Sequence, residues 1–146
     1  MKFHTPIIAA LIALVSAIPA HAIVVQEVSI TPYEIVPISV PGFYTGNVYA
    51  GINKLLVDDV AADGFCIDPF HFSLPSSSGY QYTPLANAPK PPGTMGAVKA
   101  DEIARLWAMA YSPSMTAPQA AGFQLAIWEI VGGVNFSFTG SDYGAG

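Results

Sequence analysis

Charged side chains are scarce in this sequence. Asp, Glu, Lys and Arg make up 10% of its 146 residues, whereas an ordinary soluble domain has about 25%. Only 5 residues are Lys or Arg, and they form no cluster. This argues against a nucleic-acid partner, because phosphate binding needs clustered basic side chains. The length fits one domain and excludes a two-domain enzyme.

Long hydrophobic runs are also scarce. The run Ile7–Ile18 is shorter than the roughly 20 residues that span a bilayer. It follows a polar start at Lys2 and precedes the small-x-small pattern of Ala20–Ala22, as in a secretory signal peptide. We therefore expect a signal peptide over 1–22, cleaved after Ala22. The mature module, 23–146, is then secreted or lies on the cell surface, without a membrane span.

Cysteine occurs once, at Cys66. Exported proteins usually carry cysteines in pairs that form disulfides, so a single one needs an explanation. The sequence leaves four open: a buried small apolar residue, a free thiol, an intermolecular disulfide, or a covalent link to a group other than sulfur.

Turn residues are frequent, with 13 Gly and 13 Pro, and short alternating segments lie between them. Alternation of apolar and polar residues is typical of strands. It predicts strands over Val24–Ile30, Ile35–Val40, Phe43–Ala50, Leu55–Val60, Phe65–Phe72 and Asn135–Phe138. Pro37 favours an edge position, Gly51–Lys54 is expected to join two strands, and residues 73–96 read as a long surface loop.

Two helices are expected in the second half of the chain. Over Ala97–Tyr111, Ile103, Leu106, Trp107 and Ala110 recur on one helical face. A second helix can be capped by Thr116 and closed by Gly132-Gly133. These elements predict one α+β domain, an antiparallel sheet or partial barrel with a two-helix segment.

Gln124 and Cys66 stand out from this pattern. Gln124 lies within or beside the apolar stripe of the second helix, formed by Ala120, Phe123, Ile127, Ile130 and Val131. A buried amide is unfavourable unless it is hydrogen-bonded, so it is either bonded to backbone groups or placed at the helix margin. In the strand expected at 65–72, alternation puts Cys66 and Asp68 on one side.

Together the two segments resemble a known family. Phe65-Cys66-Ile67-Asp68, followed by Phe123-Gln124-Leu125-Ala126-Ile127-Trp128, is similar to the paired motif of bacterial thioester domains. The pair also resembles that of exported Gram-negative proteins with a PEP-CTERM-type sorting anchor. The resemblance covers roughly residues 43–138.

The resemblance implies an internal thioester between the Cys66 sulfur and the Gln124 side-chain carbonyl, formed with loss of ammonia. Asp68 is then a candidate for orienting the thiol or moving a proton, and equally for a structural role in a turn. Trp128 and Phe65 are expected to shield the bond from water, or to be core aromatics. The implied function is adhesion: a Lys amine or a hydroxyl of a partner opens the bond and becomes covalently attached.

This function involves no catalytic turnover, so we expect no enzyme, no cofactor and no metal, and a monomeric chain. The sequence departs from the family because no stalk domain, wall anchor or sorting anchor follows residue 146, which leaves open whether the module is complete. The alternative is a non-reactive structural protein of the bacterial envelope or extracellular matrix with the same fold.

Other constellations are weaker. Cys66, Asp68 and His71 have a spacing that suits a metal site or a thiol hydrolase only if a bulge near Pro69 brings the histidine round. The acidic residues Asp58, Asp59 and Asp63 lack alternating oxygen ligands for calcium and fit a solvated turn better. The aromatics Tyr80, Tyr82 and Tyr111 suit either a glycan or peptide surface or the packing of the loop itself.

Overall fold

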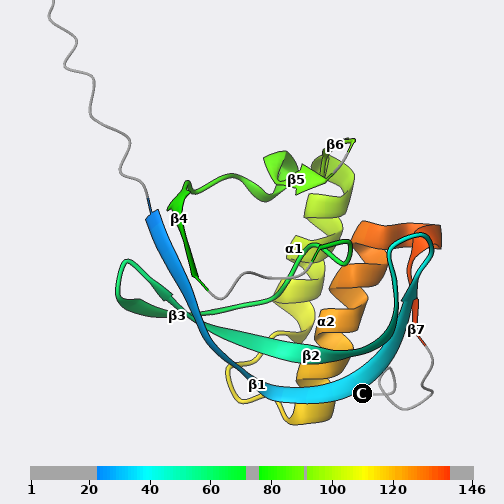
Figure 1. The fold of residues 1–146 in the computed structure, drawn as a ribbon, viewed down its shortest axis with the longest axis horizontal. Helices are drawn as coiled ribbons and strands as arrows, with labels where there is room; N and C mark the ends of the chain where they lie inside the picture. Colours follow the sequence, from blue (N-terminus) through cyan, green and yellow to red (C-terminus); the bar gives the residue numbers. More distant parts are fainter. Residues whose placement is uncertain (1–22, 72–75, 91, 139–146) are drawn as a thin grey trace, which may run out of the picture.

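The computed structural model describes residues 23–71, 76–90 and 92–138. The expected signal peptide and the segment 139–146 lie outside these ranges. Within them, a curled antiparallel sheet holds two helices on its concave side (Figure 1). The α+β class and the partial barrel predicted from the sequence are therefore confirmed.

Five strands of the described ranges form the main sheet: four lie in the order β3-β2-β1-β4, and the fifth, the short strand β7, also pairs with β1. Their bounds are β1 (Ile23–Val40), β2 (Tyr44–Val57), β3 (Val60–Gly64), β4 (Ser76–Tyr80) and β7 (Ser137–Phe138). A separate two-stranded sheet and two short 3-10 helices are the other elements besides the α-helices: β5 (Pro89–Lys90), β6 (Gly93–Thr94), η1 (Leu85–Asn87) and η2 (Gly133–Asn135). All strand pairs are antiparallel.

The first two strands are longer than the sequence predicts. Val24–Ile30 and Ile35–Val40 belong to one strand, and the connection expected at Gly51–Lys54 lies inside β2, so both predictions are wrong. Gly51 is not a turn residue here but the partner of Tyr33 in the ladder. A Cβ at Gly51 would lie 2.7 Å from the Tyr33 Cα, so glycine is needed for the close approach of the two backbones.

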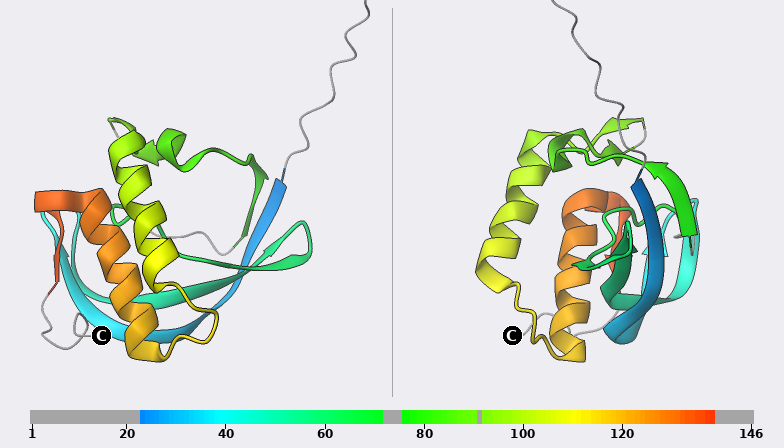
Figure 2. Two further views of the ribbon diagram at one scale, coloured as in Figure 1. Left: turned by 180° about the vertical axis from the view of Figure 1, so that it is seen from behind. Right: turned by 90° about the vertical axis from the view of Figure 1, so that its left-hand side faces the viewer.

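The curl of the sheet comes with two irregularities in the pairing of β1 with β2. They lie between Glu27 and Ser29 and between Ile30 and Tyr33. Bulges of this kind bend a strand and increase its twist, and Figure 2 shows both strands wrapping around the helices. Pro37 lies where β1 pairs with β2 alone among the described strands, as its missing N–H requires.

The turn between β2 and β3 is acidic and tight. Asp58 and Asp59 both have positive φ, 48° and 65°, as a two-residue hairpin turn requires. The strand predicted over Leu55–Val60 is therefore wrong at its end, where the chain reverses. Asp63 lies in β3 and its carboxylate is 2.8 Å from the Lys54 ammonium, so the three acidic residues do not converge on one point.

Part of the predicted surface loop is ordered as a strand. Within 73–96, β4 pairs with the beginning of β1, with Ser77 opposite Val25. The Ser- and Gly-rich composition pointed to a loop, but the backbone of β1 offers a free edge there, and its N–H and C=O groups need partners. The loop prediction is therefore wrong for Ser76–Tyr80.

The helices match the sequence closely. α1 covers Ala97–Ala110 and α2 covers Ala117–Gly132. The Thr116 backbone N–H donates to the Gln119 side chain at 2.9 Å in a capping box. Gly133 ends the helix with a φ of 56°, a backbone conformation that residues other than glycine rarely adopt.

Helix α2 is the centre of the molecule, because two hydrophobic cores meet on it. One core joins it to α1 and β2 through Phe123, Ile103 and Ile52. The other joins it to β1 through Leu125 and Val36. Nearly all of its circumference is therefore covered, which explains why its apolar residues extend around the helix rather than along a single stripe.

Candidate functional site

The segment Phe65–His71 runs between the sheet and α2 but is not a strand. The structure assigns no ladder to Phe65–Asp68, and Pro69 and Phe70 form a turn, so the strand predicted over Phe65–Phe72 is wrong as far as His71; Phe72 lies outside the described residues. The expected alternation nevertheless holds. Phe65 and Ile67 pack on one core and Cys66 on the other.

The backbone of Cys66 pairs with a side chain instead of a strand. Its N–H donates to Gln124 Oε1 at 2.9 Å, and its C=O accepts from Gln124 Nε2 at 2.7 Å. A primary amide offers the same donor and acceptor as a peptide group, so Gln124 takes the place of a neighbouring strand. We call this pair of hydrogen bonds the Cys66–Gln124 clamp.

Gln124 is buried at 1% exposure, the sole polar residue in the core of the described chain. The clamp satisfies both ends of its amide, as buried polar groups require. Cys66 fixes the orientation of the amide, because an N–H must face the oxygen and a C=O must face the nitrogen. The sequence-based interpretation of a glutamine bonded to backbone groups is confirmed, and the backbone is that of the single cysteine.

The thiol of Cys66 is largely enclosed by protein, although the residue also lines a pocket. Its sulfur is 3.3 Å from the backbone oxygen of Asp68, to which it donates. Burial raises the pKa of the Cys66 thiol, and this outweighs the opposing effects of the Asp68 backbone and the Trp128 side chain; the carboxylates of Asp68 and Glu27 raise it further. The resting group is therefore the protonated thiol at neutral pH.

The Asp68 carboxylate holds the turn that follows the cysteine. Oδ1 accepts from the Phe70 backbone N–H at 2.8 Å, an Asx-type bond. Oδ2 lies 2.7 Å from His71 Nδ1. The turn at Pro69 thus brings the histidine to the aspartate, contrary to the opposite sides that strand geometry predicts. The Asp68 carboxylate is thus engaged with this turn, whereas the backbone oxygen of Asp68 accepts from the thiol.

The two expected shielding aromatics are placed differently. Trp128 is 6% exposed and lines the same pocket as Cys66 and Gln124. Phe65 points to the other core, where its ring lies 4.6 Å from that of Phe123 and 5.8 Å from that of Trp107, centroid to centroid. Phe65 fixes the position of the backbone next to the cysteine rather than lining the pocket.

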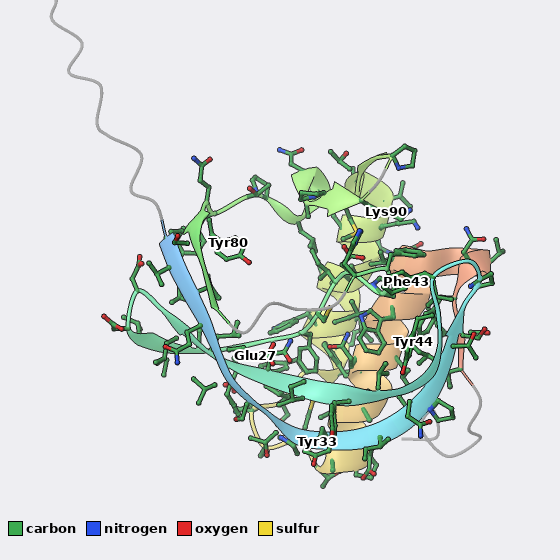
Figure 3. The ribbon with its side chains drawn as sticks, viewed as in Figure 1. Glu27, Tyr33, Phe43, Tyr44, Tyr80 and Lys90 are labelled. Atoms are coloured by element: carbon green, nitrogen blue, oxygen red, sulfur yellow. The ribbon has the colours of Figure 1, made fainter. Side chains whose placement is uncertain are left out.

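A pocket of about 230 Å³ opens beside the clamp. Its wall includes Cys66 and Gln124 together with Phe43 and Tyr44 from the hairpin between β1 and β2. Figure 3 shows these two aromatics on the inner side of the curled sheet, with Tyr33 on the outer side. Sequence reasoning missed the hairpin residues, because the curl that carries them over α2 leaves no local signal.

The structure gives little support to the metal site and the tyrosine surface considered from the sequence. Among the described residues no group of three or more His, Cys, Asp or Glu is placed to hold a metal ion. Tyr111 belongs to the aromatic cluster around Phe65 and stacks on Trp107, with centroids 4.3 Å apart. Tyr80 and Tyr82 are exposed, so the three tyrosines do not form one surface.

No helix in the described part of the chain is both long and apolar enough to cross a bilayer. No family model, curated protein or solved structure matches the chain.

Proposed function

We propose that the protein is an exported surface module in which Cys66 and Gln124 form an internal thioester that captures a partner covalently. The observation that carries the proposal is the clamp, with Gln124 Oε1 2.9 Å from the Cys66 nitrogen and Gln124 Nε2 2.7 Å from the Cys66 oxygen. It keeps the side-chain amide of one residue beside the other residue that the reaction needs. In systems whose reacting atoms are well oriented, proximity lowers a barrier by up to about 7–11 kcal/mol.

The clamp also supports the chemistry at the carbonyl. The backbone N–H of Cys66 donates to Gln124 Oε1, the atom on which negative charge develops when sulfur attacks the amide carbon. A donor fixed in advance at that atom acts as an oxyanion hole, and removing one such donor typically costs about 3–4 kcal/mol of transition-state stabilisation. The low exposure of Gln124 strengthens the effect, since little water competes.

The bond changes balance without a further reactant. The S–C bond forms between Cys66 and Gln124, the C–N bond of the amide breaks, and the thiol proton goes to the departing nitrogen, which leaves as ammonia. In the capture step a Lys amine or a hydroxyl of the partner attacks the carbonyl carbon. The C–S bond breaks, an amide or ester forms, and the thiol of Cys66 returns.

The pocket gives such a nucleophile a way to the bond. Both partners of the clamp line its wall, and so do Asp68 and His71, whereas no Lys or Arg of the described residues does. An incoming amine therefore meets a carboxylate on this wall and no Lys or Arg side chain of the described residues. A single-use attachment of this kind suits a secreted or cell-surface protein that acts without a cofactor.

A second candidate is a non-reactive structural protein of the bacterial envelope or extracellular matrix. Two observations favour it. The clamp satisfies the amide of Gln124 without any reaction, and burial raises the pKa of the Cys66 thiol, which lowers the fraction of reactive thiolate. In this case the pair serves only to hold Phe65–His71 against α2.

Intact-mass measurement separates the two candidates. The mature protein, purified without amines, is compared with Cys66→Ala and with a sample treated with methylamine. The proposal expects the wild type, but not Cys66→Ala, to lack the mass of one ammonia, and methylamine to restore mass as an adduct on Gln124. Gln26→Ala, which removes an exposed glutamine, is the matched control and should behave as the wild type. A full mass with a freely titrating thiol would leave the structural candidate.

A further inference from the structure

The indole nitrogen of Trp128 is a buried polar atom that makes no hydrogen bond in the fold. The indole N–H of Trp128 is enclosed, with the residue 6% exposed, and among the side chains of the described residues it is the one buried nitrogen or oxygen without a hydrogen-bond partner. Most buried donors in native proteins are paired, so an orphan of this kind points to a role outside the resting structure.

The indole of Trp128 lies on the same side of α2 as the Cys66–Gln124 clamp. Trp128 follows Gln124 by four residues on α2, so the two side chains lie on the same helical face, one turn apart. Both line the pocket with Cys66. The indole also packs against Phe136, with ring centroids 5.9 Å apart. Cys66 packs against the same core cluster as these two aromatic residues.

The N–H already acts on the thiol in the resting state. Its proximity lowers the pKa of Cys66, although the contact falls short of a hydrogen bond. A neutral thiol is a weak acceptor, whereas a thiolate is a strong one, and hydrogen bonds to charged groups are shorter and stronger than those between neutral groups. The orphan donor therefore matches the charged form of the sulfur better than the form that the structure holds.

We propose that the indole N–H of Trp128 donates a hydrogen bond to the Cys66 sulfur whenever that sulfur carries negative charge. In the proposed function, on which this role in the reaction rests, the thiol proton passes to water before sulfur attacks Gln124, and the departing nitrogen takes a proton back from water. The sulfur is therefore charged at that stage, and again when the C–S bond breaks and the bonding electron pair passes to sulfur. The incoming amine then gives its proton to water, and the thiolate takes one from water to become the thiol again. Trp128 keeps its own proton throughout.

The two donors at the site then have separate tasks. The Cys66 backbone N–H serves the carbonyl oxygen of Gln124, and the Trp128 N–H serves the sulfur. The other titratable groups on the pocket wall are Tyr44 and Tyr49 from β2 and Asp68 and His71 from the cysteine segment, and Glu27 from β1 also acts on the thiol. The carboxylates oppose a thiolate, so Trp128 offsets them.

The test measures the pKa of the Cys66 thiol from the pH dependence of its alkylation by iodoacetamide. It uses the free-thiol form: the wild type after methylamine opening, or the untreated protein if its mass is full. Trp128→Phe keeps an aromatic ring at this position and removes the N–H. Trp107→Phe makes the same change at the other tryptophan, outside the pocket. We expect the midpoint to rise by about one pH unit in Trp128→Phe alone, a tenfold loss of thiolate at lower pH.

An unchanged midpoint in folded Trp128→Phe would overturn the proposal. If this variant does not fold, the wild type decides through the indole ¹⁵N–¹H resonances, with that of Trp107 assigned from Trp107→Phe. We expect the Trp128 indole proton to move downfield as the thiol titrates and to stay in place in Cys66→Ala. No movement in the wild type would also overturn it.

These results are independent of the outcome for the proposed function. The mass of the untreated wild type reports whether the thioester forms, whereas the thiol midpoint reports whether Trp128 acts on the sulfur. If the thioester forms and the thiol midpoint is unchanged in Trp128→Phe, the proposed function stands and Trp128 has no role in it. If the wild type has its full mass and the midpoint rises in Trp128→Phe, Trp128 acts on the sulfur and the proposed function is wrong.

Discussion

The amide of Gln124 lies against the backbone of Cys66 as a neighbouring strand would, accepting at 2.9 Å and donating at 2.7 Å. Two residues far apart in the chain thus share a peptide-like pair of hydrogen bonds in the interior. The same contact fixes a loop and brings the residue that carries the thiol beside the amide. The predictions below separate the structural part of this contact from the chemical part.

Removing the Gln124 amide should destabilise the protein strongly. Gln124→Ala leaves the N–H and C=O of Cys66 unpaired and creates a cavity in the core, which together cost about 2–5 kcal/mol. Urea unfolding measures the loss. Gln26→Ala, an exposed change, should stay within about 0.5 kcal/mol of the wild type. Equal stability of the two variants would contradict a buried clamp.

Asp68 should act through the turn rather than through its histidine. Asp68→Ala removes the bond to the Phe70 N–H, so we expect a loss of about 1 kcal/mol and ammonia release slowed at least about tenfold as the cysteine segment loosens. His71→Ala is the matched change. The pair of side chains is 63% and 34% exposed, so little stability is lost. If both variants slow the reaction equally, the histidine is required.

A free Cys66 thiol should make the free energy of unfolding depend on pH in the alkaline range. Burial raises the pKa of this thiol above its ordinary value of 9.0, so the folded state holds the proton more tightly than the unfolded state. The resulting stability is complete below that value and is lost as the pH rises through the folded pKa. Unfolding of Gln124→Ala at about pH 8 and about pH 10 measures the loss, which should vanish when Cys66→Ala is added. An equal decline in both would assign it to other groups.

The close approach at Gly51 gives a prediction for the sheet. A Cβ there would meet the Pro32 oxygen and lie 2.7 Å from the Tyr33 Cα. Because backbone atoms cannot move aside as a side-chain tip can, Gly51→Ala should cost at least about 2 kcal/mol. Gly93→Ala is the control, since nothing lies within 4 Å of its Cβ. Thermal unfolding compares the two, and a Gly51→Ala midpoint equal to that of the control would show that β1 and β2 can separate.

The helices could be predicted because their signals are local. Thr116 caps α2 and Gly133 ends it, and both effects depend on a few neighbouring residues. The helical spacing placed Gln124 either inside the apolar stripe or at its margin, and the structure shows that it is buried. Each of these inferences needs only the adjacent sequence.

The strands were harder to predict, because alternation reports which way side chains point and not what the backbone bonds to. Around Cys66 the alternation is real, yet the partner of its backbone is the side chain of Gln124, far away in the sequence. Gly51 resembled a turn residue but serves a close contact with another strand. The contribution of Phe43 to the pocket depends on the curl of the whole sheet.

The separation of 58 residues between the two members of the clamp sets an order of events. Contacts between such distant residues form only after the loss of chain entropy has been offset by packing elsewhere. We therefore expect the amide to reach Cys66 only when α2 has docked on the sheet, late in folding. On this account a newly made or partly folded chain keeps the thiol and the amide apart, so that folding sets the time at which any reaction between them can begin.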